Sequence, residues 1–340
     1  MELSARSVKL VAIPRGTPRV EDFRIVQTPV PALGPDQILV RNAFMSLDPS
    51  MRIRMRGEDS DYLAPYVVGG VLDGFSVGTV VQSTSTRIPV DSIVRHHAGW
   101  RDIAVVDAEG DGWRQPQVIE LTGTCRAQDY LGPLGPSGLT AWAGLLKVAE
   151  LRPDDVVFVS AAAGAVGSMV VQIASKLGNR VIGSAGSADK VDYVRSIGAD
   201  AAFSYRDGDI LGQLRKCAQD GIDIYFDNVG GEQMAAALEL INARGRIALC
   251  GMVAGYGDEV MGQVPGNLFS AIAKGITLRG FLARMYAEYL PEFTDQVSGW
   301  LDDGSLVYRY SIAEGLDSAP QAFIDMLTGR TVGKALVALP

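Results

Sequence analysis

A short run rich in alanine and glycine, from Ala161 to Gly167, contains residue types that can hold a phosphorylated ligand. It follows an apolar, β-branched segment, precedes a helical one, and has the spacing AxGxxG from Ala162 onward. Gly164 lets the backbone approach a pyrophosphate, Gly167 lets the helix pack closely on the strand, and the helix N-terminus supplies amide donors. The string alone also fits a structural turn, but its place between strand and helix favours a dinucleotide site.

The residues after the second strand indicate which nucleotide is bound. An NAD-specific site usually has an acid about 20 residues past the glycines, where it bonds the ribose 2′-hydroxyl. Here the strand ends in Ser184-Ala185-Gly186-Ser187, and Lys190 follows on the first turn of the next helix. A cation there attracts the 2′-phosphate of NADP, so we predict NADPH. Asp189 leaves an alternative open, because it could cap the helix or bond the ribose hydroxyl.

A metal site and a serine hydrolase are both disfavoured. A catalytic zinc needs three protein ligands, and the chain has only two histidines, His96 and His97, which point to opposite faces of a probable strand. We expect both to be surface or hydrogen-bonded polar residues. The cysteines Cys125, Cys217 and Cys250 are far apart, and Cys250 is expected to be a small buried apolar residue. No GxSxG elbow occurs.

The composition is that of a soluble globular protein with two domains. Of 340 residues, 47% are hydrophobic and 21% charged, and three cysteines without a CxxC pair fit a reducing cytoplasm. A net charge of −8 argues against a nucleic-acid partner. Early charged residues such as Glu2 and Arg6 leave no room for a secretory signal. The uncharged stretch from Val156 to Ala174 is interpreted as strand, turn and helix, and no membrane association is expected.

The elements around these residues form two patterns. From about residue 155 to 285, short apolar strands alternate with helical periods, which predicts a doubly wound parallel sheet. The six predicted strands are Val156–Ser160, Arg180–Ser184, Ala201–Tyr205, Ile222–Asp227, Arg246–Cys250 and Thr277–Phe281.

Before residue 130 the pattern is different. Short β-rich pieces punctuated by proline and glycine predict a compact barrel or sandwich, and a tail after residue 305 could return to it. The expected strands here are Gln37–Asn42, Gly78–Ser83, Ser92–His96 and Ile103–Val106, and the tail contains Val307–Ile312, the helix Ala319–Thr328 and Lys334–Ala338.

Several blocks together resemble one family over nearly the whole chain. They are Ser46-Leu47-Asp48-Pro49-Ser50-Met51-Arg52, Gly138-Leu139-Thr140-Ala141-Trp142, Ala161–Gly167, Gly186-Ser187 with Lys190, Tyr225-Phe226-Asp227-Asn228-Val229-Gly230-Gly231, and Gly333-Lys334. The chain is similar to zinc-free medium-chain dehydrogenase/reductases, most of all to the branch of leukotriene B4 12-hydroxydehydrogenase/prostaglandin reductase, alkenal double-bond reductase and curcumin reductase. The resemblance implies a GroES-like β-barrel from residues 1–130 and 305–340, an inserted Rossmann domain, 131–304, and a homodimer.

The resemblance also assigns roles to residues. It implies that the glycine loop holds the pyrophosphate, that Lys190 and Tyr205 lie at the adenosine phosphate and ribose, and that Asn228 bonds the nicotinamide half. The implied coenzyme-binding residues are Gly164, Ala165, Val166, Gly167, Ser187, Lys190, Tyr205, Asn228, Cys250, Gly251, Met252, Tyr256, Phe281, Leu282, Ala283 and Thr331.

Two departures from the family pattern and three catalytic candidates, Tyr256, Arg52 and Ser50, complete this interpretation. Ser50 stands where the family often has a tyrosine that contacts substrate, and Thr331 stands where it often has asparagine. Tyr256 is the candidate acid or oxyanion donor, with packing on the coenzyme as the alternative. Arg52 is a second candidate, with a loop-steadying ion pair as the alternative. Asp48 is expected to cap a turn.

These observations predict an NADPH-dependent reductase that delivers hydride to the β-carbon of an α,β-unsaturated ketone or aldehyde. That chemistry needs a hydrogen-bond donor for the enolate oxygen and a proton for the α-carbon, but no metal. Two alternatives remain. The acceptor could be a quinone, or catalysis could have lapsed and left a dinucleotide-binding protein.

Overall fold

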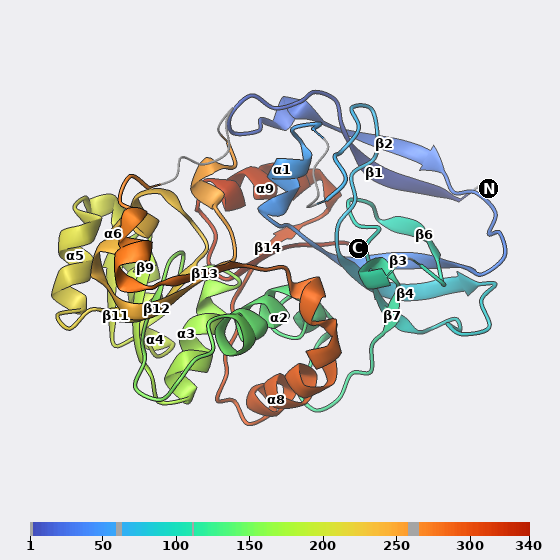
Figure 1. Cartoon of the computed structure of the whole chain (residues 1–340). Helices are drawn as coiled ribbons and strands as arrows, with labels where there is room; N and C mark the ends of the chain where they lie inside the picture. The colour runs from blue at the N-terminus through green and yellow to red at the C-terminus, as the bar shows by residue number, and fades with distance from the viewer. Residues whose placement is uncertain (1–2, 59–62, 111, 258–264) are drawn as a thin grey trace. The chain divides into compact units, whose positions relative to one another are not determined.

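The computed structural model describes residues 3–58, 63–110, 112–257 and 265–340 (Figure 1). The chain divides into two compact units. One unit comprises residues 1–132 and 310–340, and the other comprises residues 133–309. Each is described by itself.

The second unit contains a parallel sheet with the strand order β10-β9-β8-β11-β12-β13. Its central strand β8 is a continuous apolar run, Val156-Val157-Phe158-Val159, as expected where helices cover both faces of a sheet. The order reverses between β8 and β11, and at such a switch point the carboxyl ends of the strands leave a crevice for a ligand. The predicted doubly wound sheet is confirmed. The strands are β8 (Val156–Val159), β9 (Arg180–Ala185), β10 (Ala201–Ser204), β11 (Ile222–Asp227), β12 (Ile241–Leu249) and β13 (Thr277–Gly280).

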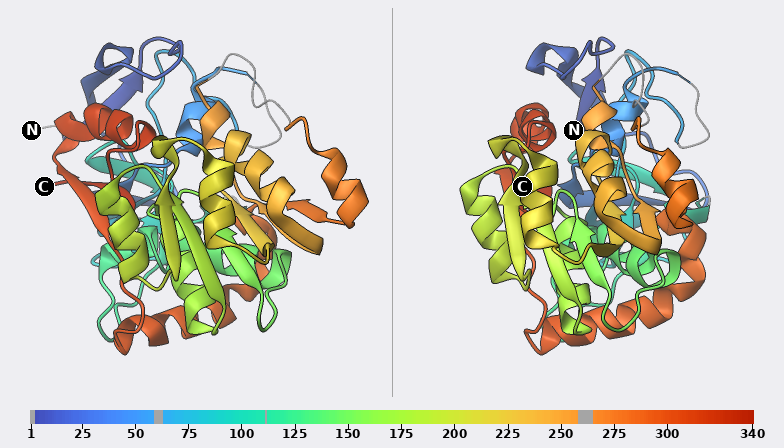
Figure 2. Two further views of the ribbon diagram at one scale, coloured as in Figure 1. Left: turned by 90° about the vertical axis from the view of Figure 1, so that its left-hand side faces the viewer. Right: turned by 60° about the vertical axis from the view of Figure 1, so that its left-hand side comes forward.

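The helices of this unit fall into two groups. Helix α2 contacts α3, whereas α5 contacts α6 and α6 contacts α7 (Figure 2). Right-handed crossovers that run in opposite directions from the switch point place their helices on opposite faces of the sheet. The helices are α2 (Pro136–Ala143), α3 (Gly167–Lys176), α4 (Ala188–Ser196), α5 (Ile210–Cys217), α6 (Gly231–Leu240), α7 (Phe269–Lys274) and α8 (Leu290–Asp302).

The first unit is an antiparallel β-structure built from both ends of the chain. Its larger sheet has the order β14-β15-β3-β4-β5-β7 with β6 on β3, and β1 pairs with β2. Leu336 lies opposite Ser46, so the last strand closes on the third. The elements are β1 (Ser4–Leu10), β2 (Phe23–Pro29), β3 (Gln37–Ser46), α1 (Ser50–Arg54), β4 (Ser76–Ser83), β5 (Ile93–His96), β6 (Ile103–Asp107), β7 (Gln117–Val118), β14 (Tyr310–Glu314), α9 (Ala319–Leu327) and β15 (Lys334–Ala338).

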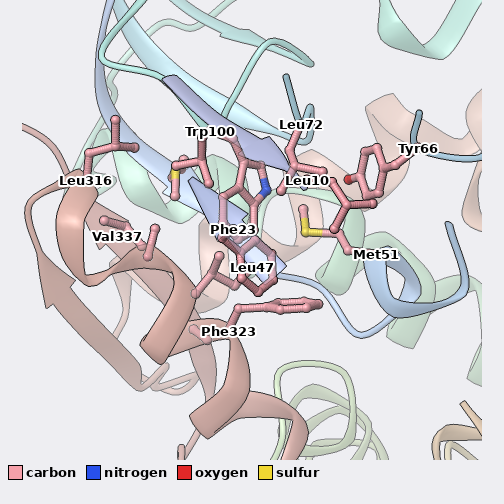
Figure 3. Close-up of a cluster of buried hydrophobic side chains, with 14 of the residues drawn as sticks. Leu10, Phe23, Leu47, Met51, Tyr66, Leu72, Trp100, Leu316, Phe323 and Val337 are labelled. Carbon is pink, nitrogen blue, oxygen red and sulfur yellow. The ribbon is translucent and has the colours of Figure 1, made fainter. Parts of the chain in front are cut away.

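An aromatic cluster forms the core of this unit (Figure 3). The ring of Trp100 stacks on Phe23 at 5.9 Å between centroids and meets the edge of Phe323 at 5.8 Å. Because Phe323 comes from α9, the C-terminal tail is part of the same core as the N-terminal strands. Within the described residues, no helix has the length and apolar character needed to cross a membrane.

The structure differs from the sequence prediction in several strands. Strands β1 and β2 were not predicted, and β12 starts at Ile241 instead of Arg246. The tail strand was predicted from Val307, but β14 begins at Tyr310, because the main chain of Val307 is bonded to the side chain of Gln172 on α3.

Candidate active site

The loop from Ala161 to Gly167 connects β8 to α3 and has the form of an anion cradle. Ala161 has φ +48°, which turns the chain sharply after the strand. A Cβ on Gly167 would lie 2.4 Å from the Ala161 carbonyl oxygen, so only glycine permits this approach of helix and loop. The backbone N–H groups of Val166 and Gly167 donate to no described residue. Two available donors at the positive end of a helix fit a pyrophosphate.

The switch point is bridged by Asn228, which follows β11. Its backbone N–H donates to Ser160 Oγ at 2.9 Å, and its Nδ2 donates to the Ser160 carbonyl at 2.8 Å. These bonds use the backbone donor and one of the two Nδ2 hydrogens of Asn228, and its Oδ1 is an acceptor. Asn228 is therefore held at the edge of the sheet where the carboxyl ends of β8 and β11 meet.

Asp227 organises the turn that carries Asn228. Its buried Oδ1 accepts hydrogen bonds from the Tyr225 hydroxyl at 2.7 Å and from the backbone N–H groups of Val229 and Gly230 at 2.9 and 2.7 Å. Burial raises the pKa of this carboxyl above its usual range, although the hydrogen bonds to it act in the opposite direction. Asp227 is thus a structural anchor of the site.

The loop after β12 packs on this turn and carries Tyr256. The N–H groups of Cys250 and Gly251 donate to the Asp227 carbonyl at 2.9 and 3.0 Å. The Tyr256 hydroxyl accepts a hydrogen bond from the Met252 N–H at 3.3 Å, and a Cβ on Gly251 would lie 3.1 Å from it. These contacts place the phenol oxygen of Tyr256 beside the backbone of Gly251 and Met252.

Cys250 was expected to be buried, but the residue is only partly buried. Burial raises the pKa of its thiol to about 12, so it is a neutral thiol near neutral pH. Cys250 therefore contributes its backbone to the loop.

The ring of Phe281, just after β13, points into the second unit. It is 6% exposed and meets the Phe226 ring edge to face at 6.2 Å. A Cβ on Gly144 would lie 2.4 Å from the Phe281 ring, so the π-helical turn Gly144–Val148 packs directly on it. Phe281 can therefore contribute only its backbone to a ligand site, whereas Leu282 and Ala283 are partly exposed.

The ends of β9 and β10 form a cationic corner. A Cβ on Gly186 would lie 3.0 Å from the Tyr205 hydroxyl, so the phenol covers the turn that leads into α4. Lys190 lies on the first turn of α4, and its pKa is lowered by burial and by the charge of Arg206. Two cations that repel each other are stabilised electrostatically when an anion binds between them. Ser187 is the N-cap residue of α4, but its side chain makes no capping bond.

Arg206 was missed by the sequence interpretation. It follows Tyr205 on a short 3₁₀ turn, and its guanidinium lies 5.9 Å from the centre of that tyrosine's ring. The signal that could have found it is the pairing of Ser204 with Ala185, which brings the residues after β10 next to those after β9.

Three predicted site residues belong to the first unit: Ser50, Arg52 and Thr331. Ser50 begins α1, and Thr331 lies shortly before β15. Arg52 is 4% exposed, and its guanidinium donates to the carbonyls of Pro14 and Gly16 at 2.8 to 3.1 Å. Arg52 makes no ion pair with any described residue. The alternative of a loop-steadying ion pair is therefore replaced by hydrogen bonds from Arg52 to main-chain carbonyls.

Asp48 forms an ion pair and does not cap a turn with its side chain. Its Oδ1 lies 2.7 Å from Nζ of the buried Lys334, and its Oδ2 accepts from Ser46 Oγ at 2.5 Å. Lys334 also donates to the Leu47 carbonyl at 2.8 Å. This ion pair joins the sequence blocks near residues 48 and 334. It holds the start of β15 close to the segment that precedes α1.

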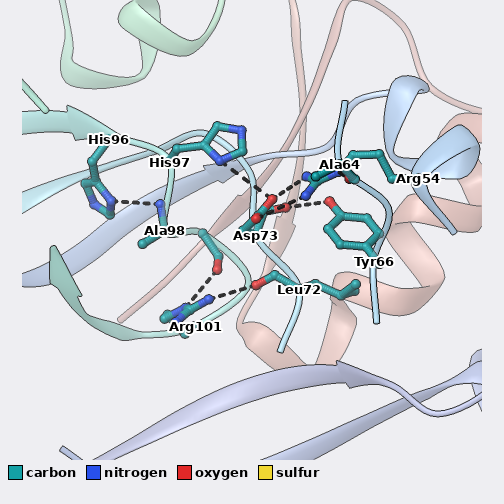
Figure 4. Close-up of polar contacts among 10 residues, drawn as sticks. Arg54, Ala64, Tyr66, Leu72, Asp73, His96, His97, Ala98 and Arg101 are labelled. Carbon is teal, nitrogen blue, oxygen red and sulfur yellow. Dashed lines mark hydrogen bonds and ion pairs between the residues drawn. The ribbon is translucent and has the colours of Figure 1, made fainter. Parts of the chain in front are cut away.

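The two histidines are hydrogen-bonded polar residues, but they are not on the surface (Figure 4). His96 Nδ1 accepts from the Ala98 N–H at 3.1 Å, so Nε2 carries the proton and donates to Asn42 at 2.8 Å. His97 Nδ1 lies 3.6 Å from Asp73, which is held by Arg54. Within the described part of the chain, no group of three His, Cys, Asp or Glu residues could hold a metal ion.

Two family models match the chain. The model described as "N-terminal domain of oxidoreductase" covers residues 6–112. The model described as "Zinc-binding dehydrogenase" covers residues 165–298, which include the end of the glycine loop, helix α3 and the strands from β9 to β13.

Related proteins match over almost their full length. The 2-alkenal reductase (NADP(+)-dependent) of Nicotiana tabacum is 36% identical, with 99% of this chain and 98% of that protein covered. The NADPH-dependent curcumin reductase of Escherichia coli is 35% identical, with 96% and 95% covered. Among solved structures, CurA from Vibrio vulnificus in complex with NADPH is 34% identical, with a TM-score of 0.92 and 98% and 99% covered.

Proposed function

The chain belongs to the branch of the medium-chain dehydrogenase/reductase superfamily that contains 2-alkenal and curcumin reductases, and we propose that it is an NADPH-dependent reductase of conjugated carbon–carbon double bonds. Its substrates are α,β-unsaturated aldehydes and ketones. The observation that carries the proposal is the full-length similarity to named reductases of this type, together with a switch-point crevice whose residues fit a dinucleotide.

The residues fit NADPH better than NADH. Lys190 and Arg206 supply two positive charges at the corner beside Tyr205, where a 2′-phosphate can accept charge-assisted hydrogen bonds. NADH has a neutral hydroxyl at the same position, so the two cations contribute far less to its binding free energy. Asp189 is on the same turn, but no carboxylate occupies the end of β9 itself.

The other proposed contacts of NADPH are those of its pyrophosphate and its nicotinamide. The Val166 and Gly167 N–H groups bind the pyrophosphate, and Asn228 Oδ1 accepts from the nicotinamide carboxamide. The backbone after β12 and from Phe281 to Ala283 lines the nicotinamide half. When bound, NADPH supplies the hydride that adds to the β-carbon of the substrate.

The chain's own chemical task is to stabilise and protonate the enolate that results. Tyr256 is the donor that we propose, because its hydroxyl is positioned by the Met252 N–H on the loop that packs on the turn of Asn228. We retain Ser50, the first residue of α1, as a candidate for contact with the substrate. Arg52 is buried on main-chain carbonyls, and we assign it the support of α1 rather than a chemical step.

We also infer a cytoplasmic homodimer. The three cysteines are free thiols, as a reducing compartment requires. The edge strand β13 is largely exposed, and Phe269 and Ile272 on the neighbouring α7 are 74% and 77% exposed. Apolar side chains beside an open strand edge favour pairing with a second copy.

Steady-state oxidation of NADPH tests the function. We expect turnover with 2-alkenals and benzalacetone-type enones, with the saturated carbonyl compound as the product. Turnover with a quinone and not with these enones would replace the proposal by the quinone alternative. Tight binding of NADPH without consumption of any of the three acceptors would support a protein whose catalysis has lapsed.

A further inference from the structure

The segment from Ser305 to Arg309 is fastened along helix α3 inside the second unit. The buried side chain of Gln172 bonds the main chain of Val307 in both directions. Its Nε2 donates to the Val307 carbonyl, and its Oε1 accepts from the Val307 N–H, each at 2.9 Å. A carboxamide that uses both ends on one residue fixes the position of that residue along the helix.

This attachment places Tyr308 at the phosphate loop. The Tyr308 hydroxyl donates to the carbonyl oxygen of Ala165 at 3.0 Å. Ala165 is one residue before Val166, whose N–H donates to no described residue and lies at the start of α3. No residue of the sequence motif makes this contact, since Tyr308 is 143 positions away.

The bond controls the direction of a neighbouring amide. A trans peptide is planar, so the carbonyl of Ala165 and the N–H of Val166 point in opposite directions. When the carbonyl is held toward Tyr308, the N–H is turned to the other side. Without the hydroxyl, this peptide can rotate and present an oxygen in place of a donor, which repels a phosphate.

We propose that Tyr308 is a positioning residue for the coenzyme: its hydroxyl holds the Ala165 carbonyl and so keeps the Val166 N–H directed at the pyrophosphate. This rests on the proposed use of NADPH. Tyr308 acts through the backbone, so it contributes equally to any ligand with that pyrophosphate and nothing to a ligand without it.

The test is calorimetry with the full-length Tyr308→Phe variant and three ligands. NADPH and NADH share the pyrophosphate, whereas 2′-AMP carries only the adenosine and its 2′-phosphate. Loss of one neutral hydrogen bond should raise the dissociation constants of NADPH and NADH by the same factor, about three- to tenfold. The dissociation constant of 2′-AMP should stay within twofold of the wild-type value.

Two comparisons separate this role from loss of packing. Tyr130→Phe removes a similar hydroxyl-to-carbonyl bond of 2.9 Å in the first unit, and it should change no dissociation constant. In turnover with an enone, Tyr308→Phe should raise the KM for NADPH and leave kcat within twofold, because the hydroxyl touches no reacting atom.

The possible failures are distinct. Unchanged NADPH and NADH binding in Tyr308→Phe overturns the positioning role and leaves the proposed function standing. Weaker binding of 2′-AMP by the same factor also overturns it, because the defect is then general. Wild-type protein that binds neither dinucleotide overturns both proposals, whereas binding without turnover removes only the proposed reaction.

Discussion

At the scale of single residues, the fold decides what each side chain can do. Lys190 was predictable from its distance past the glycine loop, because that distance is set by one strand and one turn. Arg206 was not, since it reaches the same corner through the pairing of β9 with β10. The sequence suggested that Arg52 could take part in catalysis, but its guanidinium donates hydrogen bonds to the carbonyls of Pro14 and Gly16. Burial of a cation is not visible in a local pattern.

The cationic corner predicts the coenzyme preference. We expect Lys190→Ala to raise the KM for NADPH about tenfold or more, which is the loss of one charge-assisted hydrogen bond, with little change for NADH. Arg206→Ala should act in the same direction. Kinetics with both coenzymes measure the effect, and Arg215→Ala, which removes an exposed cation on α5, is the matched control. Equal losses for NADPH and NADH would remove the phosphate role.

Tyr256 predicts a separate effect on the chemical step. Tyr256→Phe keeps the ring that packs beside Gly251 and removes the hydroxyl held by Met252. If the hydroxyl donates to the enolate, kcat should fall about 100-fold while the KM for NADPH changes little. Tyr286→Phe, within the aromatic cluster near Phe281, should retain wild-type kcat. Normal turnover in Tyr256→Phe would assign this residue to packing alone.

At the scale of elements, the strands of the second unit were predicted well because short β-rich segments alternate with helical periods there, although the polar start of β12, Ile241–Gly245, was missed. The first unit was predicted less completely. Strands β1 and β2 have no unbroken apolar runs, and their pairing depends on the aromatic core around Trp100. Asp48 was expected to act within its own turn, but its partner Lys334 is 286 residues away. Contacts between residues so far apart in sequence depend on the pairing of β15 with β3, which no local sequence pattern encodes.

The histidines at the end of β5 predict a pH-dependent stability of the first unit. Burial lowers the pKa of His96 to about 3 and that of His97 to about 4, whereas an unfolded histidine has a pKa near 6.5. Between about pH 6.5 and 4 the unfolded chain therefore binds more protons than the native one. The free energy of unfolding should fall as the pH is lowered through this window, by up to about 1.4 kcal/mol per pH unit for each histidine.

Denaturant unfolding at pH 5, 6 and 7 measures this dependence. The variant His97→Asn removes one of the two titrating groups, so its free energy of unfolding should depend less steeply on pH than that of the wild type. Acidic residues far from position 97 titrate in the same way in both proteins and cancel in the comparison, whereas Asp73 contacts His97 and is part of the measured difference. The same slope in both proteins would show that His97 does not remain neutral in the native state.

At the scale of the whole molecule, the sequence blocks that revealed the family are divided between the two units. The glycine loop, Lys190 and Asn228 are in the second, and the blocks around Ser50 and Lys334 are in the first. The relatives match across both units and not only across the dinucleotide-binding part. The function therefore belongs to the full chain, and the proposed reaction is tested on that chain.

The surface of the second unit also predicts how two chains assemble. Phe269 and Ile272 are three positions apart on α7 and therefore share one face, beside the open edge of β13. If this face pairs with a second copy, the variant Ile272→Glu buries a charge against apolar groups and should convert the dimer to a monomer in light scattering. Val90→Glu, at an exposed valine of the first unit, should leave the mass unchanged. A wild-type chain that is already monomeric at micromolar concentration would remove the dimer from the proposal, and α7 would then be an apolar surface whose partner is another molecule.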